Sequence, residues 1–199
     1  MVRCRDVDTV KLRAYLSQIL DWNDRAGLVS KRQPLDVIAR MTLRSLELWE
    51  FVCAHAPGGV AADARVVDIG TGAGFPGVVW KLASPGLRVT LAERRQKKAA
   101  FLERLPTILS LDGLDIHAGN AEQLAQLDGH AGVYDVAVTL AVGTVVDATP
   151  IVKPLLCPGG VFATVRPQDD IATEPVGDNL SSLATAPCTG GVCQLYVRT

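Results

Sequence analysis

Two long segments at the start of the chain carry apolar residues at helical spacing. The first, over residues 7–28, has a suitable stop at Gly27, because glycine readily takes left-handed backbone angles. The second begins at Pro34, which suits the first turn of a helix, and runs to the breaker at 57–59. The pattern predicts an N-terminal helical extension or cap over residues 1–59. The apolar positions expected on one face of the first helix are Val10, Leu12, Leu16, Ile19, Leu20 and Trp22.

From residue 60 onward, short β-favouring runs alternate with helical stretches, one of which extends from 96 to 111. Such alternation is typical of βαβ units, which build a parallel, doubly wound sheet. Two further runs flank Gly190-Gly191 and predict an antiparallel hairpin at the end of the sheet. Residues 60–199 are therefore expected to form one α/β domain, with a loop at 167–179. The strands are expected at 64–69, 87–93, 114–119, 133–140, 159–167, 180–187 and 193–199.

The first strand of the α/β part runs into a glycine-rich turn, VVDIGTGAGFPG, at residues 66–77. Gly70, Gly72 and Gly74 have no Cβ, so a ligand can approach the main chain closely there. Pro76 suits the first turn of the following helix, whose first amides favour a carboxylate or phosphate. The turn, including Thr71, therefore predicts a binding site for a nucleotide-like ligand.

Two ligand classes fit this turn. The spacing from Gly72 to Gly77 matches the dinucleotide pattern G-x-G-x-x-G, and Glu93 at the end of the second strand can accept hydrogen bonds from ribose hydroxyls. A ribose is common to dinucleotides and S-adenosylmethionine, so Glu93 does not separate them. Asp68 suits the ammonium of a methionine moiety and would sit badly near a pyrophosphate. The sequence therefore favours S-adenosylmethionine and leaves an NAD(P)-dependent oxidoreductase as the minor alternative.

The exit of the third strand reads HAGNAEQL, residues 117–124. Strand exits on this edge of a doubly wound sheet face the ligand crevice. Asn120, Ala121 and Glu122 are therefore expected to contact the adenine edge of the cofactor. An alternative role for Asn120 is to cap the short helix that follows it.

Several of these segments together resemble a known family. DIGTGAGFPG, the acidic end of the second strand, HAGNAEQL, YDVAVTLAV and KPLLCPGG are similar to the glucose-inhibited division protein B family. Its members are bacterial methyltransferases that methylate guanine N7 in small-subunit ribosomal RNA. The helix with Trp22-Asn23 resembles the family too, so the similarity covers roughly residues 12–166.

The resemblance implies a Rossmann-like class I methyltransferase fold, with a mostly parallel, doubly wound sheet and S-adenosylmethionine as methyl donor. It places the cofactor against Gly70, Gly72, Gly74, Phe75, Pro76, Glu93, Ala121 and Glu122. Asp68, Thr71 and Asn120 are also predicted to belong to this cofactor site, because they lie at or just beyond the ends of the first and third strands. Ribosomal RNA or the small ribosomal subunit is the implied partner.

The chain departs from the family pattern on the acceptor side. An Arg-His pair followed by Asp-Ser in the family here reads RMTLRS at 40–45, and Ser-Arg-Ala reads TLA at 139–141. A lysine at the end of the fifth strand is replaced by Arg166, and an arginine by Asn120. These changes keep open a small-molecule acceptor and a non-catalytic cofactor-binding module. Arg40, Arg44 and Arg166 are predicted to contact the acceptor.

Guanine N7 carries a free lone pair, so the sequence predicts no catalytic residue. An oxygen acceptor would need a base, for which His117 is the candidate at a strand exit. The net charge of −1 gives no global attraction to nucleic acid, so RNA binding would depend on local basic clusters. The basic residues that gather in sequence are Lys31, Arg32, Arg40 and Arg44, and then Arg94, Arg95, Lys97, Lys98 and Arg104.

The remaining composition narrows the class of protein further. Five scattered cysteines form no CxxC pair, and the two closest, Cys188 and Cys193, have no nearby histidine, so no metal site is expected. The first residues lack the apolar core of a signal peptide, and no apolar run approaches the length of a membrane span. A cytoplasmic protein that does not contact membranes is the expectation.

Overall fold

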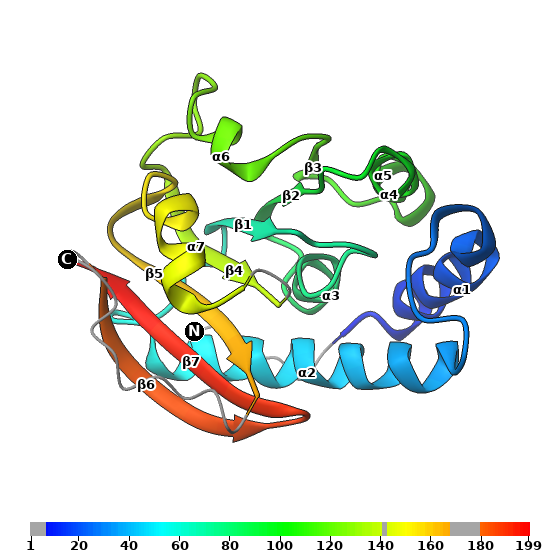
Figure 1. Cartoon of the computed structure of the whole chain (residues 1–199), viewed down its shortest axis with the longest axis horizontal. Helices are drawn as coiled ribbons and strands as arrows, with labels where there is room; N and C mark the ends of the chain where they lie inside the picture. The colour runs from blue at the N-terminus through cyan, green and yellow to red at the C-terminus, as the bar shows by residue number, and fades with distance from the viewer. Residues whose placement is uncertain (1–6, 141–142, 168–179) are drawn as a thin grey trace.

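A computed structural model describes residues 7–140, 143–167 and 180–199. Seven strands form one sheet in the order β3-β2-β1-β4-β5-β7-β6 (Figure 1). The first five are parallel, and β7 runs antiparallel between β5 and β6. The predicted doubly wound sheet with its C-terminal hairpin is therefore confirmed. The strands are β1 Arg65–Ile69, β2 Arg88–Ala92, β3 Leu114–His117, β4 Tyr134–Thr139, β5 Leu156–Arg166, β6 Leu180–Cys188 and β7 Gly191–Arg198.

Helices cover both faces of the sheet, and neighbouring strand residues alternate between two cores. Val66 of β1 packs into a cluster with α1 to α5, whereas Val67 packs into a second cluster with α6 and α7. Figure 1 shows α7 on one side of the sheet and α2 and α3 on the other. The helices are α1 Thr9–Ala26, α2 Pro34–His55, α3 Gly77–Ala83, α4 Gln96–Leu102, α5 Leu105–Leu109, α6 Ala121–Leu124 and α7 Val145–Val152. The proposed division between residues 1–59 and 60–199 stays a prediction, and α1 and α2 share the first core with the sheet.

The first helix has the predicted limits but a partly different buried face. Asp8 caps its start, and Gly27 ends it with a φ of 59°. Of the residues predicted on one face, Val10 is 77% exposed and Leu20 39% exposed, whereas Leu12, Leu16, Ile19 and Trp22 pack in or against the core. The helix turns Tyr15, Ile19 and Asn23 inward, at a spacing of four residues. Because Asn23 is polar, the pattern of apolar residues alone does not predict this buried stripe.

The helix predicted over 96–111 is divided into α4 and α5. Pro106 has no amide hydrogen, so it cannot donate to the carbonyl one turn earlier and instead lies in the first turn of α5. The periodicity of apolar residues alone predicts one continuous helix, because it takes no account of this proline. The segment 168–179, which includes most of the predicted loop, lies outside the described residues.

The second helix anchors the turn of the C-terminal hairpin. The Arg44 guanidinium donates hydrogen bonds to the carbonyls of Thr189 (2.9 Å) and Gly190 (3.2 Å). The Glu47 carboxylate accepts from the Thr189 amide (2.6 Å) and hydroxyl (2.8 Å). In the structure Arg44 thus serves the hairpin, and its role in acceptor binding stays a prediction.

Replacing Glu47 with alanine is expected to lower the free energy of unfolding by about 1–3 kcal/mol, because two donors of Thr189 lose their acceptor. Glu50→Ala, an exposed position on the same helix, is the matched control and should change it by less than about 0.5 kcal/mol. Urea unfolding followed by circular dichroism measures both. Equal effects of the two substitutions would show that Glu47 does not anchor the hairpin.

Candidate functional site

A cleft of about 440 Å³ opens at the carboxyl edge of the parallel strands. This is the edge where doubly wound sheets bind ligands, and the volume is in the range of small-molecule sites. The turn after β1, the exit of β2, the segment between β3 and α6, and Gly143 before α7 supply its walls. The lining residues are Ile69, Gly70, Gly72, Ala92, Glu93, Arg94, Arg95, Lys98, Gly119, Asn120, Ala121, Glu122, Gly143 and Ile151.

The glycine turn presents bare main chain to this cleft. Gly72 has a φ of 64°, which side chains rarely tolerate, and a Cβ there would lie 3.8 Å from the Lys98 ammonium. Its amide donates to the Glu93 carboxylate at 3.0 Å. The Gly70 amide donates to the carbonyl of Ala92 at 2.9 Å. The ends of β1 and β2 are thereby fixed to each other at the cleft.

Glu93 is held at the centre of this arrangement. Only 6% of its surface is exposed, and its second carboxylate oxygen accepts from the Arg95 amide at 2.8 Å. Each carboxylate oxygen has a further lone pair available after one such bond. The side chain is therefore both immobilised and able to accept hydrogen bonds from ligand hydroxyls.

Asp68 lies behind the turn and does not line the cleft. None of its surface is exposed, and one oxygen accepts from the Thr71 hydroxyl (2.6 Å) and the Gly77 amide (2.8 Å). The other oxygen has no hydrogen-bond partner among the described residues. Burial raises the pKa of this carboxyl to about 7, although the bonds from Thr71 and Gly77 oppose the shift. Its contact with a ligand ammonium stays a prediction.

The rest of the motif packs against the N-terminal helix. The Tyr15 hydroxyl donates to the carbonyl of Ala73 at 2.9 Å, and its ring lies 5.5 Å from that of Phe75. A Cβ on Gly74 would lie 2.9 Å from this hydroxyl. The predicted cofactor residues that are outside the cleft lining are Asp68, Thr71, Gly74, Phe75 and Pro76.

The third strand exit reaches the cleft as the sequence suggests. Asn120, Ala121 and Glu122 all line it. Asn120 occupies the N-cap position of α6, as the alternative role predicts, but its side chain makes no capping hydrogen bond. His117 does not line the cleft, and its ring nitrogen Nε2 lies 3.1 Å from the Asn120 carbonyl oxygen.

Three basic residues that the sequence assigned only to a general charged cluster line the cleft as well. Arg94 and Arg95 follow Glu93 directly, and Lys98 lies on the first turn of α4. Burial lowers the pKa of Lys98, while the nearby Glu93 opposes the shift. Their short distance from Glu93 in the sequence could have predicted this position, because residues just beyond the end of a strand lie at the same edge of the sheet.

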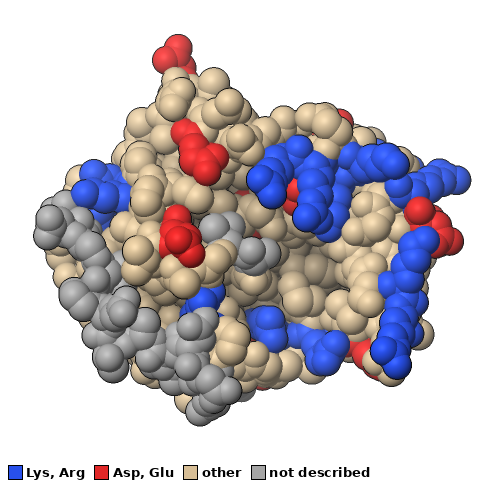
Figure 2. All heavy atoms as spheres, viewed as in Figure 1, with Lys and Arg blue, Asp and Glu red and all other residues tan. Residues whose placement is uncertain are grey.

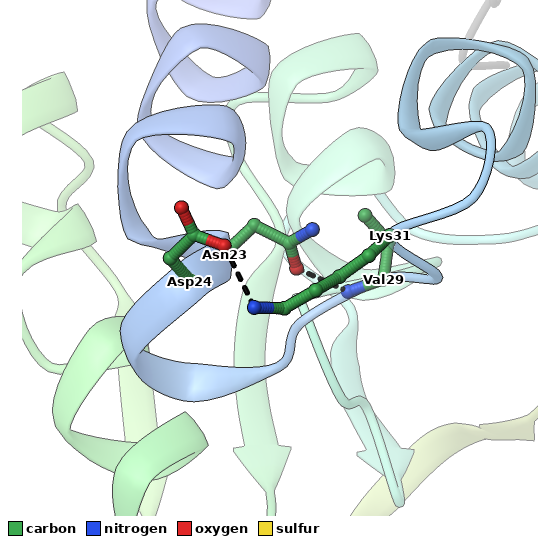
Figure 3. Close-up of polar contacts among 4 residues, drawn as sticks. All are labelled: Asn23, Asp24, Val29 and Lys31. Atoms are coloured by element: carbon green, nitrogen blue, oxygen red, sulfur yellow. Dashed lines mark hydrogen bonds and ion pairs between the residues drawn. The ribbon is translucent and has the colours of Figure 1, made fainter.

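The loop between α1 and α2 reaches the same region. Lys98 donates to the carbonyl of Leu28 at 3.5 Å. Figure 3 shows how this loop is fixed: the Asn23 side chain accepts from the Val29 amide at 2.9 Å, and Lys31 pairs with Asp24 at 2.7 Å. The N-terminal helices are therefore tied to the cleft through their connecting loop.

The predicted acceptor residues are dispersed. Arg40 is exposed on α2, and Arg44 is bound to the hairpin turn. Arg166 at the end of β5 donates to the carbonyl of Gly143, which lines the cleft. Of the three, the structure brings only Arg166 to a cleft-lining residue.

Neither a metal site nor a membrane-spanning helix is found among the described residues. No group of three or more His, Cys, Asp or Glu side chains there is placed to hold a metal ion. No helix in the same part of the chain is long and apolar enough to cross a membrane.

The strand order, the glycine turn and the acidic end of β2 define a class I methyltransferase fold. Solved structures agree: a methyltransferase from Aquifex aeolicus described as SAM dependent superposes with a TM-score of 0.60 at 12% identity, over 92% of this chain and 97% of the other. A mutant of MtNAS in complex with S-adenosylmethionine gives a TM-score of 0.63 at 15% identity, over 96% and 76%.

Sequence similarity identifies one particular family within this fold class. The family model GidB, rRNA small subunit methyltransferase G, matches residues 8–179. Ribosomal RNA small subunit methyltransferase G of Sorangium cellulosum is 36% identical over 158 residues, which are 79% of this chain and 64% of that protein. The protein of the same name from Burkholderia pseudomallei is 31% identical over 92% of this chain and 78% of its own length. The chain belongs to the GidB family of methyltransferases, as the sequence predicted.

Asp68→Asn is expected to remove a pH dependence of stability. Between about pH 4 and 7 the buried carboxyl keeps its proton when folded and loses it when unfolded, so rising pH favours unfolding. The asparagine oxygen still accepts from Thr71 and Gly77. Across this window the wild type should therefore lose roughly 2–4 kcal/mol relative to the variant.

Urea unfolding without cofactor at intervals from pH 4.5 to 7.5 measures this difference. Asp63→Asn, in an exposed turn before β1, is the control. If the stability curves of the wild type and Asp68→Asn ran parallel, Asp68 would be ionised throughout the window.

Proposed function

We propose that this protein is an S-adenosylmethionine-dependent methyltransferase that transfers a methyl group to N7 of a guanine in small-subunit ribosomal RNA, in the cytoplasm. The observation that carries the proposal is the immobilised Glu93 carboxylate facing bare main chain at Gly72, in a cleft of a GidB-family chain. The names of the relatives supply the acceptor: they are ribosomal RNA small subunit methyltransferases.

The residues present fit the proposed cofactor. Glu93 offers a fixed acceptor for two ribose hydroxyls, and Asn120 and Ala121 line the wall where the adenine is expected. The oxygen of Asp68 that has no partner among the described residues lies behind the same turn, and the cationic methionine end would favour the ionised form of this carboxyl, whose pKa lies at about 7 without it. When bound, the cofactor supplies a methyl group on a positively charged sulfur, which is already electrophilic.

The side chains of the cleft suit an acceptor that needs no base. The described lining residues include no histidine, cysteine or tyrosine; of the two carboxylates, Glu93 accepts from two backbone amides and is assigned to the ribose, and Glu122 is assigned to the adenine edge. Guanine N7 attacks through its own lone pair, so the protein needs only to align it and exclude water. This supports a ring nitrogen over an oxygen acceptor, which would require a base within hydrogen-bond reach.

The surface around the cleft supports an RNA acceptor. Figure 2 shows Lys and Arg side chains on several sides of the central hollow, with few acidic side chains between them. The exposed basic residues nearest in the fold are those after β2 and those of the loop between α1 and α2. Local positive charge of this kind attracts a polyanion although the whole chain carries a net charge of −1.

Glu93→Gln is expected to weaken binding of S-adenosylhomocysteine by roughly ten- to hundredfold, because a charged acceptor for the ribose is lost. Isothermal titration calorimetry measures the dissociation constant, and a thermal melt confirms that the variant is folded. Glu103→Gln, at the exposed end of α4, is the matched control and should bind as the wild type does. Wild-type affinity of Glu93→Gln would contradict the proposed cofactor position.

The acceptor is tested with a labelled methyl donor. Small ribosomal subunits from a bacterium that lacks its own family member, and separately a metabolite extract, are incubated with the protein. Label recovered as 7-methylguanosine in the RNA is the expected result. Label in a metabolite would indicate a small-molecule methyltransferase, and no label despite firm cofactor binding would indicate a non-catalytic module.

A further inference from the structure

We propose that Arg94 and Arg95 form a phosphate-binding subsite at the edge of the cofactor cleft, which holds the backbone of the RNA beside the methylated base. This rests on the proposed function, because it assigns a part of the acceptor to residues of the same cleft. Both arginines line the cleft and both are exposed. They follow Glu93 directly, so their backbone is fixed by its bond to the Arg95 amide.

The guanidinium groups of these two arginines are available to a ligand. Within the described part of the chain, neither group makes a hydrogen bond or an ion pair with another side chain or with the main chain. Other basic residues nearby are engaged: Lys31 pairs with Asp24, and Arg104 stacks on the Trp22 ring at 4.3 Å. A planar guanidinium is the side chain best suited to bind phosphate with two donors at once.

The net charge of the cleft also favours an anionic group on the acceptor. The described lining has three cationic side chains, Arg94, Arg95 and Lys98, against the two carboxylates of Glu93 and Glu122. The proposed cofactor adds a net positive charge, since its sulfonium and ammonium outweigh its carboxylate. Lys98 lies beside Glu93 and donates to the Leu28 carbonyl, which leaves the two arginines against the single carboxylate of Glu122.

The position of the two arginines matches what methylation of a base requires. A base in a folded RNA must leave its stack to enter a cleft, and its backbone phosphates then stay at the entrance. Arg94 and Arg95 are exposed while also lining the cleft, so a phosphate can reach them from outside. The contact would fix the register of the RNA and would carry no sequence information itself.

The test measures RNA affinity as a function of salt. A fluorescent small-subunit rRNA fragment is titrated at several salt concentrations, with S-adenosylhomocysteine saturating. Arg94→Gln and Arg95→Gln should each weaken binding up to about fivefold, as exposed charge pairs do. Each lost phosphate contact should lower the slope of log K against log salt by about 0.7. The affinity of either variant for S-adenosylhomocysteine alone should stay within about twofold of the wild type.

Arg88→Gln is the matched control, since Arg88 is exposed at the opposite end of the same strand and should leave the slope unchanged. Equal slopes for all three variants would overturn the proposal. So would a loss of cofactor affinity as large as the loss of RNA affinity, because the arginines would then bind the cofactor. Loss of affinity for free guanosine 5′-monophosphate with wild-type RNA binding would overturn it in favour of a mononucleotide. A wild-type protein that fails to bind S-adenosylhomocysteine would instead refute the proposed function.

Discussion

The main chain between β1 and α3 is closely packed by neighbouring helices and strands, and the geometry of the site depends on this close packing. A Cβ on Gly74 would lie 2.7 Å from Val78 and 2.9 Å from the Tyr15 hydroxyl, and a Cβ on Gly77 would lie 2.5 Å from Leu91. Contacts this short force neighbouring atoms to move. Gly74 thus lets α1 approach the turn and Gly77 lets α3 begin against β1 and β2, whereas Gly70 and Gly72 leave main chain open to the cleft. One short motif therefore meets two separate requirements.

The two acidic residues near this turn, Glu93 and Asp68, have different surroundings. Glu93 faces the cleft and accepts bonds from two backbone amides, which compensate a carboxylate that is 6% exposed. Asp68 is two strand positions from the first glycine but wholly buried, and one of its oxygens has no partner among the described residues. Burial without full compensation favours the protonated form. Residues that look equivalent in the sequence, an acid near each strand exit, are thus distinguished by solvent access.

The sequence was sufficient for the parts of the site that follow from strand exits. Gly70, Gly72, Glu93 and Asn120 could be placed on one edge because parallel strands end together and helices return the chain. The same reasoning could not show that the turn packs against Tyr15, because that contact depends on how α1 packs: the Tyr15 hydroxyl and its acceptor Ala73 are 58 residues apart in sequence. Nor could it assign Arg44, whose partners lie 145 residues along the chain in the hairpin turn.

The engagement of Arg44 changes how the departures from the family pattern are interpreted. An arginine where the family has an aspartate suggests a new contact for the acceptor when it is read on a single helix. In the fold, its guanidinium and the Glu47 carboxylate together hold one turn of the hairpin. The hairpin strand β7 pairs with β5, whose end carries Arg166 beside the cleft-lining Gly143. Arg44 is therefore a fixed support for the sheet edge beyond β5, and of the three arginines predicted to contact the acceptor only Arg166 reaches a cleft-lining residue, so its acceptor contact stays the prediction that the fold favours most.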